Sequence, residues 1–371
     1  MRSYGPLLRM AMKRSLILGT RGTTRLRVSR GRLVSDMLAG FWRLGPVTIS
    51  TAELTESATL LLKSGAGGLA WCRVRGSHLQ SSAAAGQLHQ AYRLQTLQAA
   101  VHERNLKKVV TLLRAAGVEP VLVKGWAVAR LYSEPGMRSY VDLDLCVLPD
   151  QYARAKAVLE SPDAAGCGVD LHNGFGKFYD CRNNELMSRS ELVNLDDLDI
   201  RILGAEDHLR FLCLHLLRHG AVRPLWLCDI AVSIENRPRD FDWDRALGHS
   251  RREAGWVACA IGLAHHLLGV EIEGTPVERP VKNVPSWLIP AVLKGWGTVF
   301  RSRPVVANYL RRPIGPLGDL LCHWPNPIEA TMSLRGSFNE LPRLPFQITH
   351  VASRATALAA QIFRRNAETT D

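Results

Sequence analysis

Two aspartates one residue apart, Asp142 and Asp144, lie in the apolar stretch VDLDLCVL. In a β-strand the side chains alternate between two faces, so both carboxylates would share one face and Leu143, Leu145 and Val147 the other. Two carboxylates aimed at one point repel each other unless a positive charge lies between them. Because Mg²⁺ prefers oxygen ligands, the pattern predicts a divalent-cation site at this strand.

A third acidic residue, Asp170, occurs in the stretch GVDLHNGF, which reads as another strand. A carboxylate on a neighbouring strand would complete a site for two Mg²⁺ ions about 4 Å apart, an arrangement that promotes in-line displacement at phosphorus. Asp170 could also accept the proton of an attacking hydroxyl group. His172 lies two residues later on the same face, where it could contact a substrate.

Positive charges precede the aspartates in the chain. Lys124 and Gly125 follow the apolar run VEPVLV, and Arg138 lies in the loop SEPGMRSY. A triphosphate needs cations in addition to metal, and a glycine lets the backbone approach a phosphate at the start of a helix. An Asp-x-Asp pair alone, however, also occurs at solvated strand ends that bind no metal.

The elements that position these residues follow from periodicity and turn signals. Apolar residues with helical spacing, among them Leu94, Leu97 and Val101, predict a long helix over residues 88–116 that stops at Gly117. Short strands are predicted where apolar runs are bounded by turn residues. The remaining expected elements are strands at 118–123, 141–148 and 168–175, helices at 125–132 and 150–160, and four helices between residues 204 and 269.

The order of these segments resembles the uncharacterised nucleotidyltransferase family of the polymerase-beta-like superfamily. The matching segments are KGWAVARLY, PGMRSYVDLDLCV, VDLH, EDHLRFLCLHLLRHG, WLCDIA and DWDRAL, which lie within about residues 88–269. The resemblance implies an α+β fold with a small mixed β-sheet of nucleotidyltransferase type, flanked by N- and C-terminal helical regions. It also implies transfer of a nucleoside monophosphate from a nucleoside triphosphate to an acceptor, with pyrophosphate leaving.

The resemblance also implies roles for individual residues. The residues implied to be catalytic and to bind metal, as two Mg²⁺ ions, are Asp142, Asp144 and Asp170. Those expected to bind the nucleotide, such as ATP, are Lys124, Gly125, Arg138 and, from its place beside Asp170, His172. The expected protein is therefore an enzyme, a magnesium-dependent transferase whose hydroxyl acceptor is an unidentified small molecule, peptide or protein.

Two departures from the family pattern motivate an alternative. Trp126 follows Gly125 where the superfamily usually has serine or a second glycine, so its indole could close the phosphate pocket or pack beneath it. Few residues separate the strands at 141–148 and 168–175, where an extra strand or hairpin is usual, so the sheet could lack an element. The alternative is a catalytically degenerate binding or scaffold protein that retains the fold.

Other polar and aromatic residues have simpler interpretations. His215 and His219 share a helix face, but residue 216 is leucine, so the zinc motif H-E-x-x-H is excluded and interhelical or surface histidines are expected. Asp229 lies in an apolar helix, and burial of an unpaired carboxylate is costly, so we expect a partner such as Arg218 or Arg223. The tryptophans expected in the core are Trp226, Trp243 and Trp256.

The charge of the chain is concentrated at its start. Of the net charge of +13, residues 1–36 contribute +8, from nine Lys or Arg against the single acid Asp36. We expect a disordered basic arm, with a true start at Met37 or a transit peptide as alternatives. A nucleic-acid-binding arm would need aromatic residues among the basic ones, and only Tyr4 is present, so nucleic acid is not an expected partner.

The remaining composition describes a globular chain. Its 371 residues are 46% hydrophobic, and no apolar run approaches the roughly 20 residues of a membrane-spanning helix, so no membrane partner is expected. Eight cysteines without a C-x-x-C pair indicate a reduced, cytoplasmic protein. The expected organisation is a tail (1–36), a helical region (37–117), the nucleotidyltransferase-like core (118–204), a helical domain (205–300) and an irregular or helical end (301–371).

Overall fold

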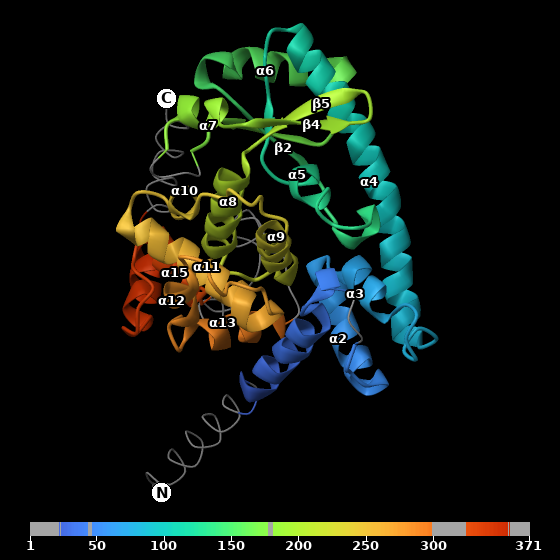
Figure 1. Ribbon diagram of the computed structural model, residues 1–371, viewed down its shortest axis with the longest axis vertical. Coiled ribbons are helices and arrows are strands. Elements are labelled where there is room, and N and C mark those ends of the chain that lie inside the picture. Colours follow the sequence, from blue (N-terminus) through green and yellow to red (C-terminus); the bar gives the residue numbers. More distant parts are fainter. Residues whose placement is uncertain are drawn as a thin grey trace, which may run out of the picture.

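A five-stranded mixed sheet carries the acidic residues (Figure 1). The computed structural model describes residues 22, 24–43, 47–176, 181–298, 324–354 and 356. The strands are β1 (Val121–Leu122), β2 (Leu143–Val147), β3 (Val169–Asn173), β4 (Glu191–Leu195) and β5 (Leu198–Ile202). Their order is β3-β2-β1-β5-β4, in which β2 and β3 are parallel, β1 and β5 are parallel, and the other two pairs are antiparallel.

Helices surround this sheet, which confirms the expected α+β class. The helices before the last strand are α2 (Thr51–Ser64), α3 (Gly67–Val74), α4 (Ala83–Ala115), α5 (Trp126–Ala129), α6 (Tyr152–Leu159) and α7 (Asn183–Ser188). Those after it are α8 (Ala205–Arg218), α9 (Pro224–Glu235), α10 (Trp243–Leu247), α11 (Arg251–Leu268), α12 (Glu278–Lys282), α13 (Leu288–Trp296) and α15 (Pro327–Ser333). Short 3₁₀ turns are η1 (Phe41–Arg43), η2 (Pro135–Met137), η3 (Pro149–Gln151) and η4 (Pro162–Ala164). Residues 24–38 and 344–354 are also helical.

The alternation predicted for the Asp-x-Asp strand is present in β2. Leu143, Leu145 and Val147 are fully buried in a core cluster that also contains residues of α4 and α6. Cys146, which points to the opposite face, belongs to a second and larger cluster shared with α8 and α9. One face of the sheet is thus sealed by α4 and α6, and the other faces the C-terminal helices, as Figure 1 shows.

The long helix α4 runs along one side of the molecule and connects the sheet with α2 and α3 (Figure 1). It begins earlier than predicted because the Ser82 hydroxyl accepts a hydrogen bond from the Ala85 amide, which caps its first turn. Its C-terminal half is buried through residues such as Leu106 and Leu113, whereas Leu94 and Leu97 are 54% and 66% exposed. Periodicity therefore predicted the helix, but not where its apolar face is covered.

The expectation of a disordered arm through residue 36 is wrong for the described part of that segment. Residues 24–38 form a helix whose inner face is packed, with Val34 and Ser35 buried. The Ser35 hydroxyl donates a 2.7 Å hydrogen bond to the Leu267 carbonyl at the end of α11. Apolar residues spaced along this basic segment give the helix a buried face. Residues 1–21 and 23 lie outside the described residues.

The hairpin β4–β5 was not predicted, and it supplies two of the five strands. The strands join at Asp196 and Asp197, and Asp196 has a φ of 56°, in the left-handed region that tight hairpin turns use. Lys107 of α4 holds both turn carboxylates at 3.1 Å. The short connection between β2 and β3 adds no strand. The two further strands, β4 and β5, follow β3 in the chain instead.

Within the described part of the chain, no helix is both long and apolar enough to cross a membrane. The described cysteines are free thiols, and burial raises the pKa of Cys213 and Cys228. Cys322 lies outside the described residues.

A buried histidine on α8 predicts acid sensitivity of the fold. Burial, and secondarily the positive charge of Arg130, lowers the pKa of His208 to about 4, against about 6.5 in an unfolded chain. Between these values the unfolded chain takes up a proton that the folded chain does not. The free energy of unfolding should therefore fall as pH drops from 6.5 towards 4, by up to about 3 kcal/mol from this residue.

Urea unfolding of the wild type and of His208→Gln at pH 7.5 and 4.5 would measure this contribution. The wild type should lose more stability between the two pH values than the variant. Equal losses in both proteins would show that His208 is not the responsible group.

Candidate active site

Parallel pairing of β2 with β3 brings the predicted residues together. Asp144 lies opposite Asp170 in the register, and Cys146 lies opposite His172. Because Asp170 and His172 are two residues apart on β3, both point to the face on which Asp144 lies. The surroundings of the side chains differ sharply, since Asp144 is 2% exposed, His172 22% and Asp170 55%.

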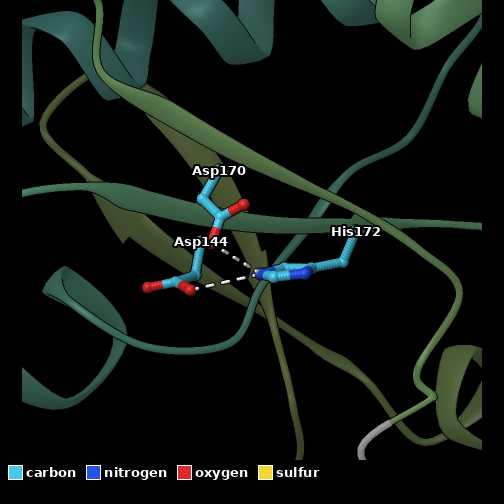
Figure 2. Close-up of side chains that lie close together, drawn as sticks. All are labelled: Asp144, Asp170 and His172. Atoms are coloured by element: carbon cyan, nitrogen blue, oxygen red, sulfur yellow. Dashed lines mark hydrogen bonds and ion pairs between the residues drawn. The ribbon is translucent and has the colours of Figure 1, made fainter. Parts of the chain in front are cut away.

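The imidazole of His172 contacts both carboxylates (Figure 2). Its Nε2 atom lies 3.2 Å from Asp144 Oδ1 and 3.4 Å from Asp170 Oδ2. One potential ligand atom from each of the three residues lies within 4.8 Å of the others. Two carboxylate oxygens and an imidazole nitrogen at this spacing could hold a divalent cation. His172, expected as a nucleotide contact, is thus also a potential metal ligand.

Asp142 lies just before β2 and outside this close group of three, although it lines the same cavity as Asp144 and Asp170. Burial raises the pKa of the Asp142 carboxyl, and the neighbouring carboxylates Asp144 and Asp170 raise it further, while Lys124 acts in the opposite direction. The negative charges of the three aspartates therefore act on one another, and a cation among them would relieve this repulsion. The set of donors fits a bound metal, with Asp142 at its edge.

Lys124 lies directly against the most buried carboxylate. Its Nζ atom is 2.6 Å from Asp144 Oδ1, the same oxygen that His172 contacts. β1, the central strand, ends at Leu122, and the turn at Lys124 and Gly125 connects it to α5. The predicted phosphate-binding lysine therefore lies in direct contact with a predicted metal-binding carboxylate.

Gly125 occupies a conformation that other residues avoid. Its φ is +64° and its ψ is −118°, and a Cβ atom there would lie 3.3 Å from both the Asp142 carbonyl oxygen and Tyr140 Cδ2. Gly125→Ala should lower the free energy of unfolding by about 1–3 kcal/mol, because strain of this kind carries such a cost. Chemical denaturation would measure it, with Gly86→Ala on α4, where an added Cβ meets nothing, as the control. Equal stability of Gly125→Ala and the wild type would contradict the prediction.

Trp126 packs beneath the turn and does not close the pocket. Its side chain is 6% exposed and belongs to the core cluster that contains Leu106 and Tyr140. It is not among the residues that line the cavity beside the aspartates. Of the two positions considered for its indole, the structure therefore shows the one that leaves the site open.

Arg138 forms a buried ion pair with Asp229 of α9. Its Nε and Nη2 atoms donate hydrogen bonds of 3.0 and 2.6 Å to the two carboxylate oxygens, and the Tyr132 hydroxyl donates a third bond of 2.8 Å. The partner expected for Asp229, Arg218 or Arg223, was therefore wrong. The observed partner, Arg138, lies 91 residues earlier in the chain, on the loop before β2, so local sequence could not indicate it. This bidentate contact fixes α9 against that loop, and a nucleotide contact of Arg138 stays a prediction.

The aspartates line one side of a cavity of about 1530 Å³. Its lining includes Lys124, Gly125 and the three aspartates, and also residues of the α8–α9 turn and of the C-terminal segment. Trp226 is among them and is only partly buried, whereas Trp243 and Trp256 lie in the core as predicted. No sequence pattern indicated the C-terminal contribution, which comes from residues such as Asn326, Glu340 and Arg343.

The mixed sheet with its helices is an α+β fold, and its convergent carboxylates beside a lysine are consistent with a protein of the nucleotidyltransferase class. Residues 52–167 and 163–269 match the model of the uncharacterised nucleotidyltransferase family. These matches together span more than half of the chain, which therefore belongs to that family, as the motifs predicted. Comparisons with curated proteins and with solved structures give no match.

Proposed function

We propose that this protein transfers a nucleoside monophosphate from a nucleoside triphosphate to a hydroxyl acceptor, with Mg²⁺ as the metal. The observation that carries the proposal is the convergence of Asp144, Asp170 and His172 beside Lys124, where Lys124 and the two aspartates line a large cavity. Membership of a nucleotidyltransferase family supports the same reaction class.

The proposed roles follow from position and burial. Asp144, which is buried, and Asp142 and Asp170 would hold the metal, with His172 as a further ligand or substrate contact. Bound Mg²⁺ would offset the charge of the phosphates and make the α-phosphorus easier to attack. Lys124 and the Gly125 backbone would bind the phosphate oxygens.

Asp170 is the proposed general base because it is the most exposed of the group, at 55%. It would take the proton from the acceptor hydroxyl, whose oxygen then forms a bond to the α-phosphorus as the bond to the pyrophosphate oxygen breaks. A cavity of about 1530 Å³ exceeds the roughly 300–1,000 Å³ of a typical ligand pocket, which supports binding of a nucleotide and an acceptor together.

Of the two observations that motivated a degenerate scaffold, the first gains no support, because Trp126 lies in the core and does not line the cavity. The β2–β3 connection does lack an extra strand, but the hairpin β4–β5 brings the sheet to five strands. A cytoplasmic location is part of the same proposal, since nucleoside triphosphates are available there and the cysteine pattern suits a reduced compartment.

The reaction can be tested with each of the four α-³²P-labelled ribonucleoside triphosphates and Mg²⁺. Acceptors would be a mixture of small hydroxyl compounds, a serine- and tyrosine-containing peptide, and the protein itself. We expect label on an acceptor together with an equal amount of pyrophosphate, both lost on addition of EDTA. Lack of Mg²⁺-dependent triphosphate binding in calorimetry on the same sample would refute the proposal.

A further inference from the structure

A group of rings and one guanidinium forms a second side of the cavity, at the turn between α8 and α9. This aromatic wall consists of His215, His219, Arg223 and Trp226, all of which line the cavity. The ring centroids of His219 and Trp226 are 5.4 Å apart, and the Arg223 guanidinium carbon lies 5.1 Å above the centroid of the indole. The imidazole of His215 meets the indole edge-on at 4.6 Å. The contacts hold these side chains as a unit.

The aromatic wall is fixed close to the carboxylates. Asp229 lies one helical turn after Trp226 on α9, and its buried ion pair with Arg138 ties this helix to the loop that leads into Asp142. The charge of Asp142 also acts on Arg223 and partly offsets the lowering of the Arg223 pKa by burial. The buried ion pair and the interaction between the charges of Asp142 and Arg223 thus both place the wall beside the acidic group.

The chemistry of the wall suits a flat, neutral, aromatic ligand. Every base of a nucleotide offers a π-face that stacks on an aromatic ring or on a guanidinium plane. All four residues of the wall present a ring or a planar cation, and the wall contains no carboxylate. In nucleotidyl transfer the nucleoside is attached directly to the reacting phosphorus, so its base must lie in the same cavity, one ribose away from the acidic group.

Trp287, a second tryptophan that lines the cavity, lies just before α13 and has different neighbours. The guanidinium of Arg343 lies over its ring at 5.0 Å, and Glu340 lies beside it through hydrogen bonds donated by Ser286. The charges of Arg343 and Glu340 act on each other, so these two residues offer no net positive charge to a phosphate.

We propose that Trp226 and Arg223, with His219 at their edge, bind the base of the nucleoside triphosphate. This inference rests on the proposed function and adds to it the part of the cavity that recognises the nucleoside. The site would accept any of the four bases, because stacking requires only a π-face.

The test uses isothermal titration of the full chain with two probes, Mg²⁺-ATP and inorganic triphosphate with Mg²⁺. The second probe has the phosphates without a base. Trp226→Ala should weaken ATP binding about tenfold, which corresponds to roughly 1.4 kcal/mol, and leave inorganic triphosphate unchanged. Trp226→Phe should retain most of the ATP affinity, and Arg223→Ala serves as a second variant on a partly exposed residue.

Trp287→Ala is the matched control, since it removes an indole that lines the same cavity but does not belong to the aromatic wall. A loss of ATP affinity in Trp287→Ala but not in Trp226→Ala or Arg223→Ala would overturn the assignment. So would equal losses for both probes, because the wall would then act on the phosphates. A wild type that binds ATP no more tightly than inorganic triphosphate refutes the base site alone, whereas one that binds neither refutes the proposed function.

Discussion

Replacement of Asp144 by asparagine is expected to lower Mg²⁺-dependent nucleotidyl transfer by about a thousandfold or more, a loss typical of a central catalytic residue. Asp144 is the most buried carboxylate of the group, and it is contacted by both Lys124 and His172. A neutral amide of nearly the same size keeps the packing and removes the charge. The measurement is pyrophosphate release with the most active triphosphate, together with calorimetric titration of Mg²⁺-triphosphate.

Asp150→Asn is the matched control, because Asp150 is an exposed carboxylate beyond the other end of the same strand. It should behave as the wild type. Thermal unfolding of both variants would separate a loss of function from a loss of fold. Full Mg²⁺-dependent activity in a folded Asp144→Asn protein would exclude this carboxylate from the metal site.

The largest expected effect on stability comes from the ion pair between Arg138 and Asp229. The two side chains are 7% and 1% exposed, and the carboxylate also accepts a hydrogen bond from Tyr132. Removal of one partner leaves the other charge buried, which typically costs about 3–5 kcal/mol. Asp229→Ala should therefore lower the free energy of unfolding by that amount, as measured by urea denaturation, a large share of the roughly 5–15 kcal/mol of a typical domain.

A double variant separates the buried charge from the loss of packing. Arg138→Met with Asp229→Leu removes both charges and should be less destabilised than Asp229→Ala. The exposed pair of Lys282 and Glu278 provides the opposite control, since Glu278→Ala should change stability by less than about 1 kcal/mol. If Asp229→Ala were as stable as the wild type, the ion pair between α9 and the loop before β2 would not contribute to stability.

Local pattern was enough to predict the elements that carry the site. Alternation along β2 and β3 follows from the two-residue period of a strand, so the shared face of Asp170 and His172 could be read from the sequence. The end of α4 before Gly117 likewise depends on neighbouring residues. The β4–β5 hairpin was missed because β4 is mostly exposed and has no continuous apolar run.

The sequence by itself determined which residues have metal- and phosphate-binding chemistry and on which strand faces they lie, because these properties arise from side-chain type and backbone period. Only the tertiary structure decided their partners. In the folded chain Asp144 is buried, Arg138 pairs with Asp229, and Trp226 lines the cavity while Trp126 lies in the core. These outcomes depend on contacts between segments far apart in the chain, which no local pattern encodes.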